Sequence, residues 1–136
     1  MTKTLIFTAT YNEKENIQIL IEKIINLKID TDILVIDDNS PDQTGELLKD
    51  LQKTMPNLKV IIREKKLGLD TAHKIAFKYA KENNYQKLIT LDADLSHDPI
   101  EIPKIIDLLD TNSFVIGSRY MDGGKCEMSF LRLILS

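Results

Sequence analysis

The chain has 136 residues, of which 43% are hydrophobic and 29% charged, and its formal net charge is −3. This length fits one domain with its own hydrophobic core. With 21 acidic and 18 basic residues there is no overall basic character of the kind that nucleic-acid binders show, so nucleic acid is excluded as an expected partner. The single cysteine cannot form an internal disulfide, the first residues show no secretory signal, and no apolar run is as long as a membrane span. We therefore expect a cytoplasmic protein whose membrane contact, if any, is peripheral.

Short apolar runs recur along the chain and are separated by longer stretches with helical spacing. The runs at residues 4–8, 33–36, 58–62, 88–91 and 114–116 predict five strands. The run at 33–36 is continuous rather than alternating, which is typical of a strand buried on both faces.

The stretches between these runs predict four helices. Asn12 and Glu15 form a capping-box pattern before a helix at about 13–27, and the turn DDNSPDQTG precedes the second helix. Asp98, Pro99 and Glu101 indicate the start of the fourth helix. The apolar positions that mark the helices and their buried faces are, in chain order, Ile17, Leu20, Ile21, Ile24, Ile25, Leu47, Leu48, Leu51, Met55, Ala72, Ile75, Ala76, Tyr79, Ala80, Ile105, Ile106, Leu108 and Leu109.

Five strands alternating with four helices predict an α/β fold with a doubly wound, mostly parallel sheet, because parallel neighbours need crossover connections. We expect a single domain over residues 1–136. The composition changes after Gly117, where residues 118–125 are typical of a loop and residues 129–136 are almost wholly apolar. Residues 129–135 are hard to bury on one face, so we expect them to contact a partner surface, a second copy of the chain or lipid.

Polar side chains follow every predicted strand. Because the carboxyl ends of parallel strands meet at one edge of a sheet, where ligands bind in such folds, these residues predict one ligand-binding crevice. In chain order they are Thr10, Tyr11, Asn12, Glu13, Asp37, Asp38, Arg63, Asp92, Asp94, Ser118 and Arg119.

Several of these side chains have two interpretations. Asp92 and Asp94 either present oxygens to a divalent cation such as Mg²⁺ or Mn²⁺, or cap a turn and face solvent. Asp37 and Asp38 either stabilise a turn, or one of them hydrogen-bonds a ribose or a base edge. His97 is either a metal ligand or acid/base group, or a residue of the turn beside it.

The basic residues after the third predicted strand and His73 also need a functional or a structural interpretation. The basic residues Arg63, Lys65 and Lys66 either meet a phosphate or form a solvated loop. His73 lies on the flank of a helical stripe, so we expect it to be structural.

Five motifs in order resemble family 2 nucleotide-sugar glycosyltransferases, and among these the dolichol-phosphate and polyprenol-phosphate mannosyltransferases. The motifs are TYNEKEN at 10–16, VIDDNSPDQTGE at 35–46, KKLGLDTAHKIAFKYA at 65–80, LDADLSHDP at 91–99 and IGSRYMDGG at 116–124. The resemblance implies a GT-A fold that is truncated after the fifth strand, with residues 118–136 at the start of the acceptor region. It implies three ligands: a nucleotide-sugar donor, a divalent cation and a lipid-phosphate acceptor.

The resemblance also implies a role for each matching residue. Asp92 and Asp94 would hold the metal and the diphosphate, and Asp94 and Arg119 would be catalytic, with Arg119 beside the acceptor phosphate. Ser96 and His97 would lie near the donor sugar or the metal. The remaining expected substrate-binding residues are Thr10, Tyr11, Asn12, Glu13, Asp37, Asp38 and Lys66.

Two departures from the family pattern stand out. Asp70 occupies a position where the family usually has a second glycine, so it either perturbs the donor's diphosphate or caps the helix that begins there. The TATYNE segment also lacks the proline that is usual before its second threonine.

The implied reaction transfers a hexose, most simply mannose from GDP-mannose, to a polyprenyl or dolichyl phosphate by inverting displacement. A lipid phosphate is largely ionised at pH 7 and needs no strong general base. UDP-glucose is an alternative donor. Two other functions are considered: a non-catalytic nucleotide-sugar-binding fragment, and an aspartyl-phosphate phosphatase with Asp92 as its nucleophile.

Overall fold

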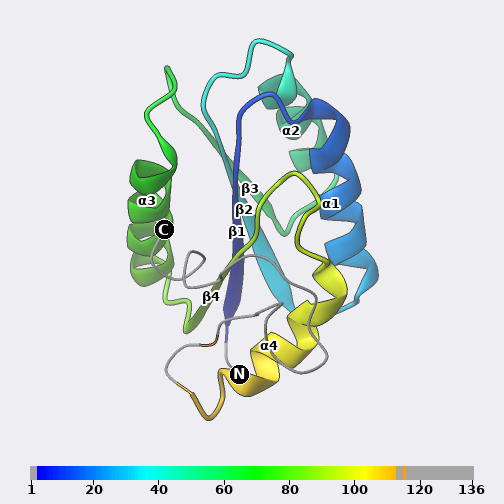
Figure 1. Ribbon diagram of the computed structural model, residues 1–136, viewed down its shortest axis with the longest axis vertical. Helices are drawn as coiled ribbons and strands as arrows, with labels where there is room; N and C mark the ends of the chain where they lie inside the picture. The colour runs from blue at the N-terminus through cyan, green and yellow to red at the C-terminus, as the bar shows by residue number, and fades with distance from the viewer. Residues whose placement is uncertain (1–2, 113–114, 116–136) are drawn as a thin grey trace. The chain divides into compact units, whose positions relative to one another are not determined.

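The structure is a computed structural model that describes residues 3–112 and residue 115. Strands and helices alternate along this part of the chain as the sequence predicts (Figure 1). The elements are β1 (Thr4–Thr10), α1 (Lys14–Asn26), β2 (Thr31–Asp37), α2 (Thr44–Gln52), β3 (Leu58–Ile62), α3 (Leu69–Glu82), β4 (Lys87–Thr90), a 3₁₀ turn (Pro99–Glu101) and α4 (Ile102–Leu108). Apart from Val115, the expected strand at 114–116 lies outside the described residues, as do Ser118, Arg119 and the apolar segment 129–135.

The chain divides into two compact units, residues 1–100 and residues 101–136, and the first contains the sheet. The described strands form one parallel sheet in the order β3-β2-β1-β4. The chain therefore runs outward from β1 through β2 to β3 and then crosses back to place β4 on the other side of β1. In open parallel sheets, ligands bind at the carboxyl ends of the strands where the order reverses in this way. The topology assigns that place to the ends of β1 and β4.

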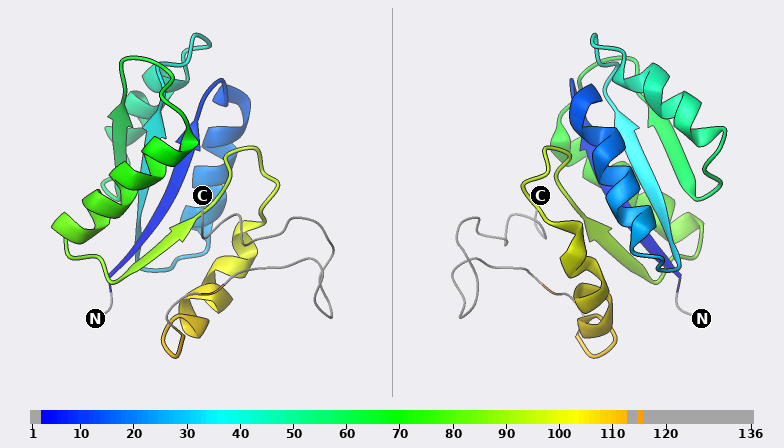
Figure 2. Two further views of the ribbon diagram at one scale, coloured as in Figure 1. Left: turned by 60° about the vertical axis from the view of Figure 1, so that its left-hand side comes forward. Right: turned by 90° about the vertical axis from the view of Figure 1, so that its right-hand side faces the viewer.

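The reversal also puts the helices on opposite faces of the sheet. Figure 2 shows α1 and α2 on one face and α3 on the other. On the α3 face, three alanines at successive turns of the helix pack with alternate residues of the two central strands, because small side chains allow the helix to lie close to the sheet. This core consists of Ala72, Ala76, Ala80, Leu5, Phe7, Leu34 and Ile36.

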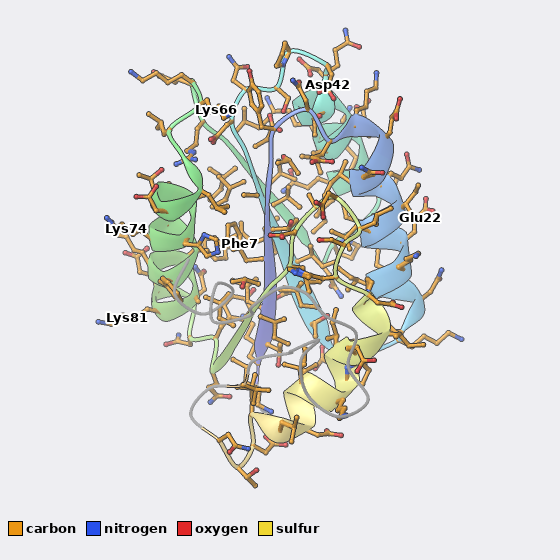
Figure 3. All side chains as sticks on the ribbon, in the orientation of Figure 1. Phe7, Glu22, Asp42, Lys66, Lys74 and Lys81 are labelled. Atoms are coloured by element: carbon orange, nitrogen blue, oxygen red, sulfur yellow. The ribbon has the colours of Figure 1, made fainter. Side chains whose placement is uncertain are left out.

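His73 is structural, as expected. Its Nδ1 lies 2.9 Å from the carbonyl oxygen of Leu69, and its ring meets the Phe7 ring edge to face at 5.1 Å. Phe7 lies between β1 and α3 in Figure 3. The imidazole is therefore part of the packing between helix and sheet.

The predicted capping box at the start of α1 is wrong. The N-cap residue is Glu13, no side chain of its own turn caps the helix, and Asn12 has a positive φ of 59°. The backbone amides at this end instead donate hydrogen bonds to side chains of the turn after β2. The predicted buried face of α1 is correct for Ile17, Leu20, Ile21 and Ile24, whereas Ile25 is 42% exposed.

Two expectations for later helices need correction. Asp70 lies in the first turn of α3 and does not cap it, because the N-cap residue is Gly68 and no side chain bonds there. In α4 the buried residue is Ile102, and Leu108 is 39% exposed. Pro103 lies at the second position of α4. A proline costs no hydrogen bond there, because the backbone amides of the first helical turn have no acceptor within the helix.

The close approach of α3 to the sheet predicts that it tolerates no larger side chain at its centre. We expect Ala76→Leu to lower the free energy of unfolding by about 1–3 kcal/mol, because the added atoms have no space in the packed core. Phe77, the next residue of the same helix, is 52% exposed, and we expect Phe77→Leu to change it by less than about 0.5 kcal/mol. Urea unfolding of the two variants tests the packing, and equal losses would contradict it.

Candidate functional site

Four loops follow the carboxyl ends of the strands, and each is fixed by particular side chains. The loop after β1 is the first of them, and its position is set by the buried carboxylate of Asp37 at the end of β2. Asp37 accepts hydrogen bonds from the Thr10 hydroxyl at 2.7 Å, the Ser40 amide at 3.0 Å and the Ser40 hydroxyl at 2.6 Å. Its side chain has no exposed surface. Of its two interpretations, the structure supports the turn-stabilising role, while contact with a base or ribose stays a prediction.

The turn after β2 also satisfies the backbone at the start of α1. Three successive amides, those of Asn12, Glu13 and Lys14, donate to the Ser40 hydroxyl, the Thr44 hydroxyl and the Asp42 carboxylate at 2.9, 3.2 and 3.2 Å. Burial raises the pKa of Asp42, but hydrogen bonds from Thr44 and Lys14 outweigh it and leave the pKa below its usual value. This end of the helix is therefore closed by side chains, while those of Tyr11 and Asn12 remain exposed.

A buried ion pair fixes the loop between β3 and α3. The Arg63 guanidinium contacts both carboxylate oxygens of Asp38, through Nε to Oδ1 and through Nη2 to Oδ2 at 2.7 Å. Arg63 is only 8% exposed, so it is not part of a solvated basic loop. The expected run of three basic residues is split, because Lys65 and Lys66 are exposed while Arg63 is paired.

Lys66 and Tyr11 come together across the edge of the sheet. The Lys66 ammonium lies 4.4 Å from the centre of the Tyr11 ring, which is a cation–π geometry. One residue follows β1 and the other follows β3, so the contact joins two loops that are far apart in sequence. Both side chains are exposed and accessible to a ligand.

The loop after β4 contains Asp92 and Asp94, the two aspartates of the sequence DAD at 92–94, which is called the DAD motif. The Asp92 amide donates to Nδ1 of His97 at 3.0 Å, and Nε2 of the same ring lies 3.8 Å from the Asp92 carboxylate. The amide hydrogen requires Nδ1 to be an acceptor, which places the proton of a neutral ring on Nε2. His97 thus has the turn role of its two interpretations, and a role in binding the sugar or metal stays a prediction.

Asp94 lies two residues further along, directly before Leu95, which has a positive φ of 67°. The Ser96 amide donates to its carboxylate at 3.0 Å. The Ser96 hydroxyl and amide hold the pKa of Asp94 below its usual value, against a smaller opposing effect of burial. The carboxylate is therefore ionised and exposed at neutral pH, as a ligand of a hard cation must be.

A metal would need more ligands than these two carboxylates. No group of three or more histidine, cysteine, aspartate or glutamate side chains within the described residues is placed to hold a metal ion. Asp92 and Asp94 fit a cation whose other positions are filled by phosphate oxygens and water, which is the usual arrangement for Mg²⁺.

Sequence reasoning missed four residues that shape the site. Ser40, Asp42 and Thr44 hold the start of α1, and Thr71 accepts a hydrogen bond from Arg63 at 2.6 Å. The signal for the first three was the run of hydroxyl and acidic residues after β2, but their partners lie 28 to 31 residues away in the chain.

None of the helices in the described part of the chain is long and apolar enough to cross a bilayer.

Comparisons with known proteins agree with this architecture. Over 98% of its length the chain is 40% identical to a dolichol-phosphate mannosyltransferase of Pyrococcus furiosus and 36% identical to a polyprenol monophosphomannose synthase of Mycolicibacterium smegmatis. It is 35% identical to an undecaprenyl-phosphate mannosyltransferase of Micrococcus luteus over 90% of its length. The matches cover 38%, 52% and 51% of these relatives, so the chain spans about half their length or less.

Solved structures show the same fold. A mannosyltransferase of Pyrobaculum calidifontis in complex with GDP-Man and Mn²⁺ superposes with a TM-score of 0.62 at 21% identity, over 83% of this chain and 33% of that one. Glucosyl-3-phosphoglycerate synthase of Mycobacterium tuberculosis, in complex with Mn²⁺, UDP and phosphoglyceric acid, gives 0.58 at 19% identity, over 85% and 41%. The sheet and its helices therefore form a GT-A fold, as the resemblance implies.

The family description that matches the chain is Glycosyl transferase family 2, over residues 5–130. The match includes the loops after all four described strands, and the resemblance seen in the five sequence motifs is confirmed. The chain belongs to glycosyl transferase family 2.

Proposed function

We propose that the chain is the donor-binding part of a glycosyltransferase that transfers mannose from GDP-mannose to a polyprenyl phosphate. The observation that supports this most is the position of the DAD loop after β4. It lies at the carboxyl end of the sheet, on the strand next to β1, where the strand order reverses. The names of the relatives support the choice of sugar and acceptor.

In this proposal the donor lies along the carboxyl ends of β1 and β4. Tyr11 and Asn12 offer exposed side chains for the base and ribose, and Lys66 offers a positive charge for the diphosphate. Asp92 and Asp94 would hold a divalent cation together with the diphosphate, and hydrogen bonds from Ser96 hold the pKa of Asp94 below its usual value. Thr10, Glu13, Asp37, Asp38 and His97 shape the loops that carry these groups, and their contact with the substrate, which the resemblance implies, is part of this proposal.

The reaction needs little acid or base chemistry. An oxygen of the lipid phosphate forms a bond to the anomeric carbon of the sugar while the bond from that carbon to the diphosphate breaks, and the nucleoside diphosphate leaves with the electron pair. A bound cation supplies neutralisation of the charge on this leaving group. Arg119, outside the described residues, is the proposed partner of the acceptor phosphate. The lipid acceptor favours a peripheral site of action at the cytoplasmic face of a membrane.

The two alternative functions are an aspartyl-phosphate phosphatase and a non-catalytic nucleotide-sugar-binding fragment. Membership of the family gives no support to an aspartyl-phosphate phosphatase, and the motif that suggested it follows the fourth strand, β4. The fragment hypothesis concerns catalysis rather than binding. Because the chain spans about half the length of its relatives or less, donor binding and sugar transfer by this chain are separate proposals. Titration of the donor tests binding alone.

We expect donor binding to depend on a divalent cation. Because the described acidic groups supply too few ligands for a metal alone, Mn²⁺ should bind weakly by itself and strongly with GDP-mannose. Asp92→Asn and Asp94→Asn should each weaken Mn²⁺-dependent binding about tenfold or more. Calorimetric titration of GDP-mannose with Mn²⁺ or with EDTA measures this.

The matched control is Asp30→Asn, an exposed aspartate in the loop before β2, which should bind as the unmodified chain does. Equal affinity with Mn²⁺ and with EDTA would contradict the proposal, as would an equal effect of all three variants. UDP-glucose titrated in parallel decides between the two donors.

Tyr11 gives a second test, because an exposed aromatic ring at the sheet edge suits a nucleobase. Loss of base–aromatic stacking costs about 1–3 kcal/mol, so Tyr11→Ala should weaken GDP binding about 5-fold to 150-fold. Phe77→Ala removes an exposed ring from α3 and should leave the affinity unchanged. Titration of GDP with Mn²⁺ measures both, and an unchanged affinity of Tyr11→Ala would remove the ring from the proposed site.

A further inference from the structure

The outer side of α3 combines positive charge with an exposed aromatic ring. Four of its residues lie on one side of the helix, because they have the spacing i, i+3, i+4 and i+7. They are Lys74, Phe77, Lys78 and Lys81, and all four are exposed. Figure 3 shows Lys74 and Lys81 extending from α3 away from the sheet. These four residues are called the α3 face.

The charge around the α3 face is opposite in sign to that of the whole chain. Five exposed lysines and three exposed acidic residues lie within residues 64–82, whereas the chain has a formal net charge of −3. Glu82 lies 3.9 Å from Lys78 at the end of the helix. Among the described residues, neither Lys74 nor Lys81 has an ion-pair partner. The α3 face is therefore a basic region on an acidic protein.

Apolar side chains are exposed along the same segment. Phe77 is 52% exposed, which is the largest exposed fraction of any large hydrophobic side chain on the α-helices of the described part of the chain. Leu69 in the first turn of α3 and Leu67 in the loop before it are 49% and 46% exposed. Covering these side chains would remove apolar surface from water, which is favourable. A partner that covers α3 has to accept an aromatic ring and several ammonium groups together.

A bilayer with anionic headgroups meets both requirements. Lysine is depleted in interfaces between proteins, whereas at a membrane its ammonium stays at the level of the headgroups while its apolar stem lies deeper. Aromatic rings enter the boundary between headgroups and acyl chains. Each lysine near an anionic leaflet strengthens binding about fivefold. The composition of the α3 face thus favours a lipid surface over a second protein.

We propose that the α3 face lies against an anionic membrane surface, with the Phe77 ring inserted and the lysines at the headgroups. The helix begins at the carboxyl edge of the sheet, directly after the loop that contains Lys66. A membrane along α3 therefore places that edge, where the donor is proposed to bind, beside the bilayer that would supply a lipid phosphate. This consequence rests on the proposed function, whereas the membrane contact does not.

Insertion of the ring can be observed directly, because the chain contains no tryptophan and one that is introduced reports only its own surroundings. Phe77→Trp should shift its fluorescence to shorter wavelength when phosphatidylglycerol vesicles are added, and brominated acyl chains should quench it. Ile19→Trp is the matched control, since Ile19 is 43% exposed on α1, on the opposite face of the sheet (Figure 2), and should do neither. No quenching of Phe77→Trp, or equal quenching at the two positions, would overturn the inference.

Vesicle flotation tests the role of charge. The chain should bind phosphatidylcholine vesicles that contain phosphatidylglycerol, bind pure phosphatidylcholine less, and be released by high salt. Replacing both Lys74 and Lys81 by alanine should weaken binding about tenfold or more, because two headgroup contacts are lost. Replacing Lys23 of α1 and Lys49 of α2 by alanine removes the same charge from exposed positions and should change binding less than about twofold. Equal losses in the two double variants would contradict the proposal.

Other contacts give different results in these experiments. If residues 129–135 alone bound the vesicles, loss of Lys74 and Lys81 would have no effect. If a second copy of the chain covered α3, the fluorescence of Phe77→Trp would change with protein concentration before any lipid is added. Either result would overturn the inference. Titration of GDP-mannose without lipid tests the proposed function separately, so the failure of one proposal is distinguishable from the failure of the other.

Discussion

Two neighbouring carboxylates at the end of β2 hold three of the four loops that form the site. Successive side chains at the end of a strand point to opposite faces of the sheet. Asp37 accordingly accepts hydrogen bonds from Thr10 and Ser40 on the side of α2. Asp38 pairs with Arg63, which begins the loop between β3 and α3. A buried carboxylate is costly without partners, so each of these loops has one favourable position. The parallel pairing of β1 with β2 places them together at one edge.

The fourth loop is constructed differently, and this difference suits its proposed role. The DAD loop after β4 takes its shape from short-range contacts, between Asp92 and His97 and between Asp94 and Ser96. Asp94 is exposed, and the carboxylate of Asp92 is only partly covered. The buried carboxylates of β2 therefore organise the backbone, while those after β4 remain available to a cation. The same residue type is therefore buried after one strand and accessible after another at the same edge of the sheet.

The sequence predicted the fold well because its signals are local. Continuous apolar runs such as 33–36 and the alanines of α3 identify strands and a packed helix without knowledge of their partners. The partners themselves could not be predicted. The acceptors for the first amides of α1 come from residues about 30 positions later, and Arg63 looked like one of three loop cations although it is buried. Contacts of that range depend on the strand order, which no local pattern specifies.

We propose that donor and metal bind at the carboxyl edge of the sheet between β1 and β4. Mn²⁺ is paramagnetic, so trace amounts added to isotope-labelled protein with GDP-mannose should broaden nearby amide resonances. We expect the amides of Asp92, Asp94 and Ser96 to broaden first, followed by that of Tyr11, while those of Ile25 and Lys28 at the opposite edge stay sharp. Broadening that begins at the opposite edge, or that is uniform along the chain, would contradict it.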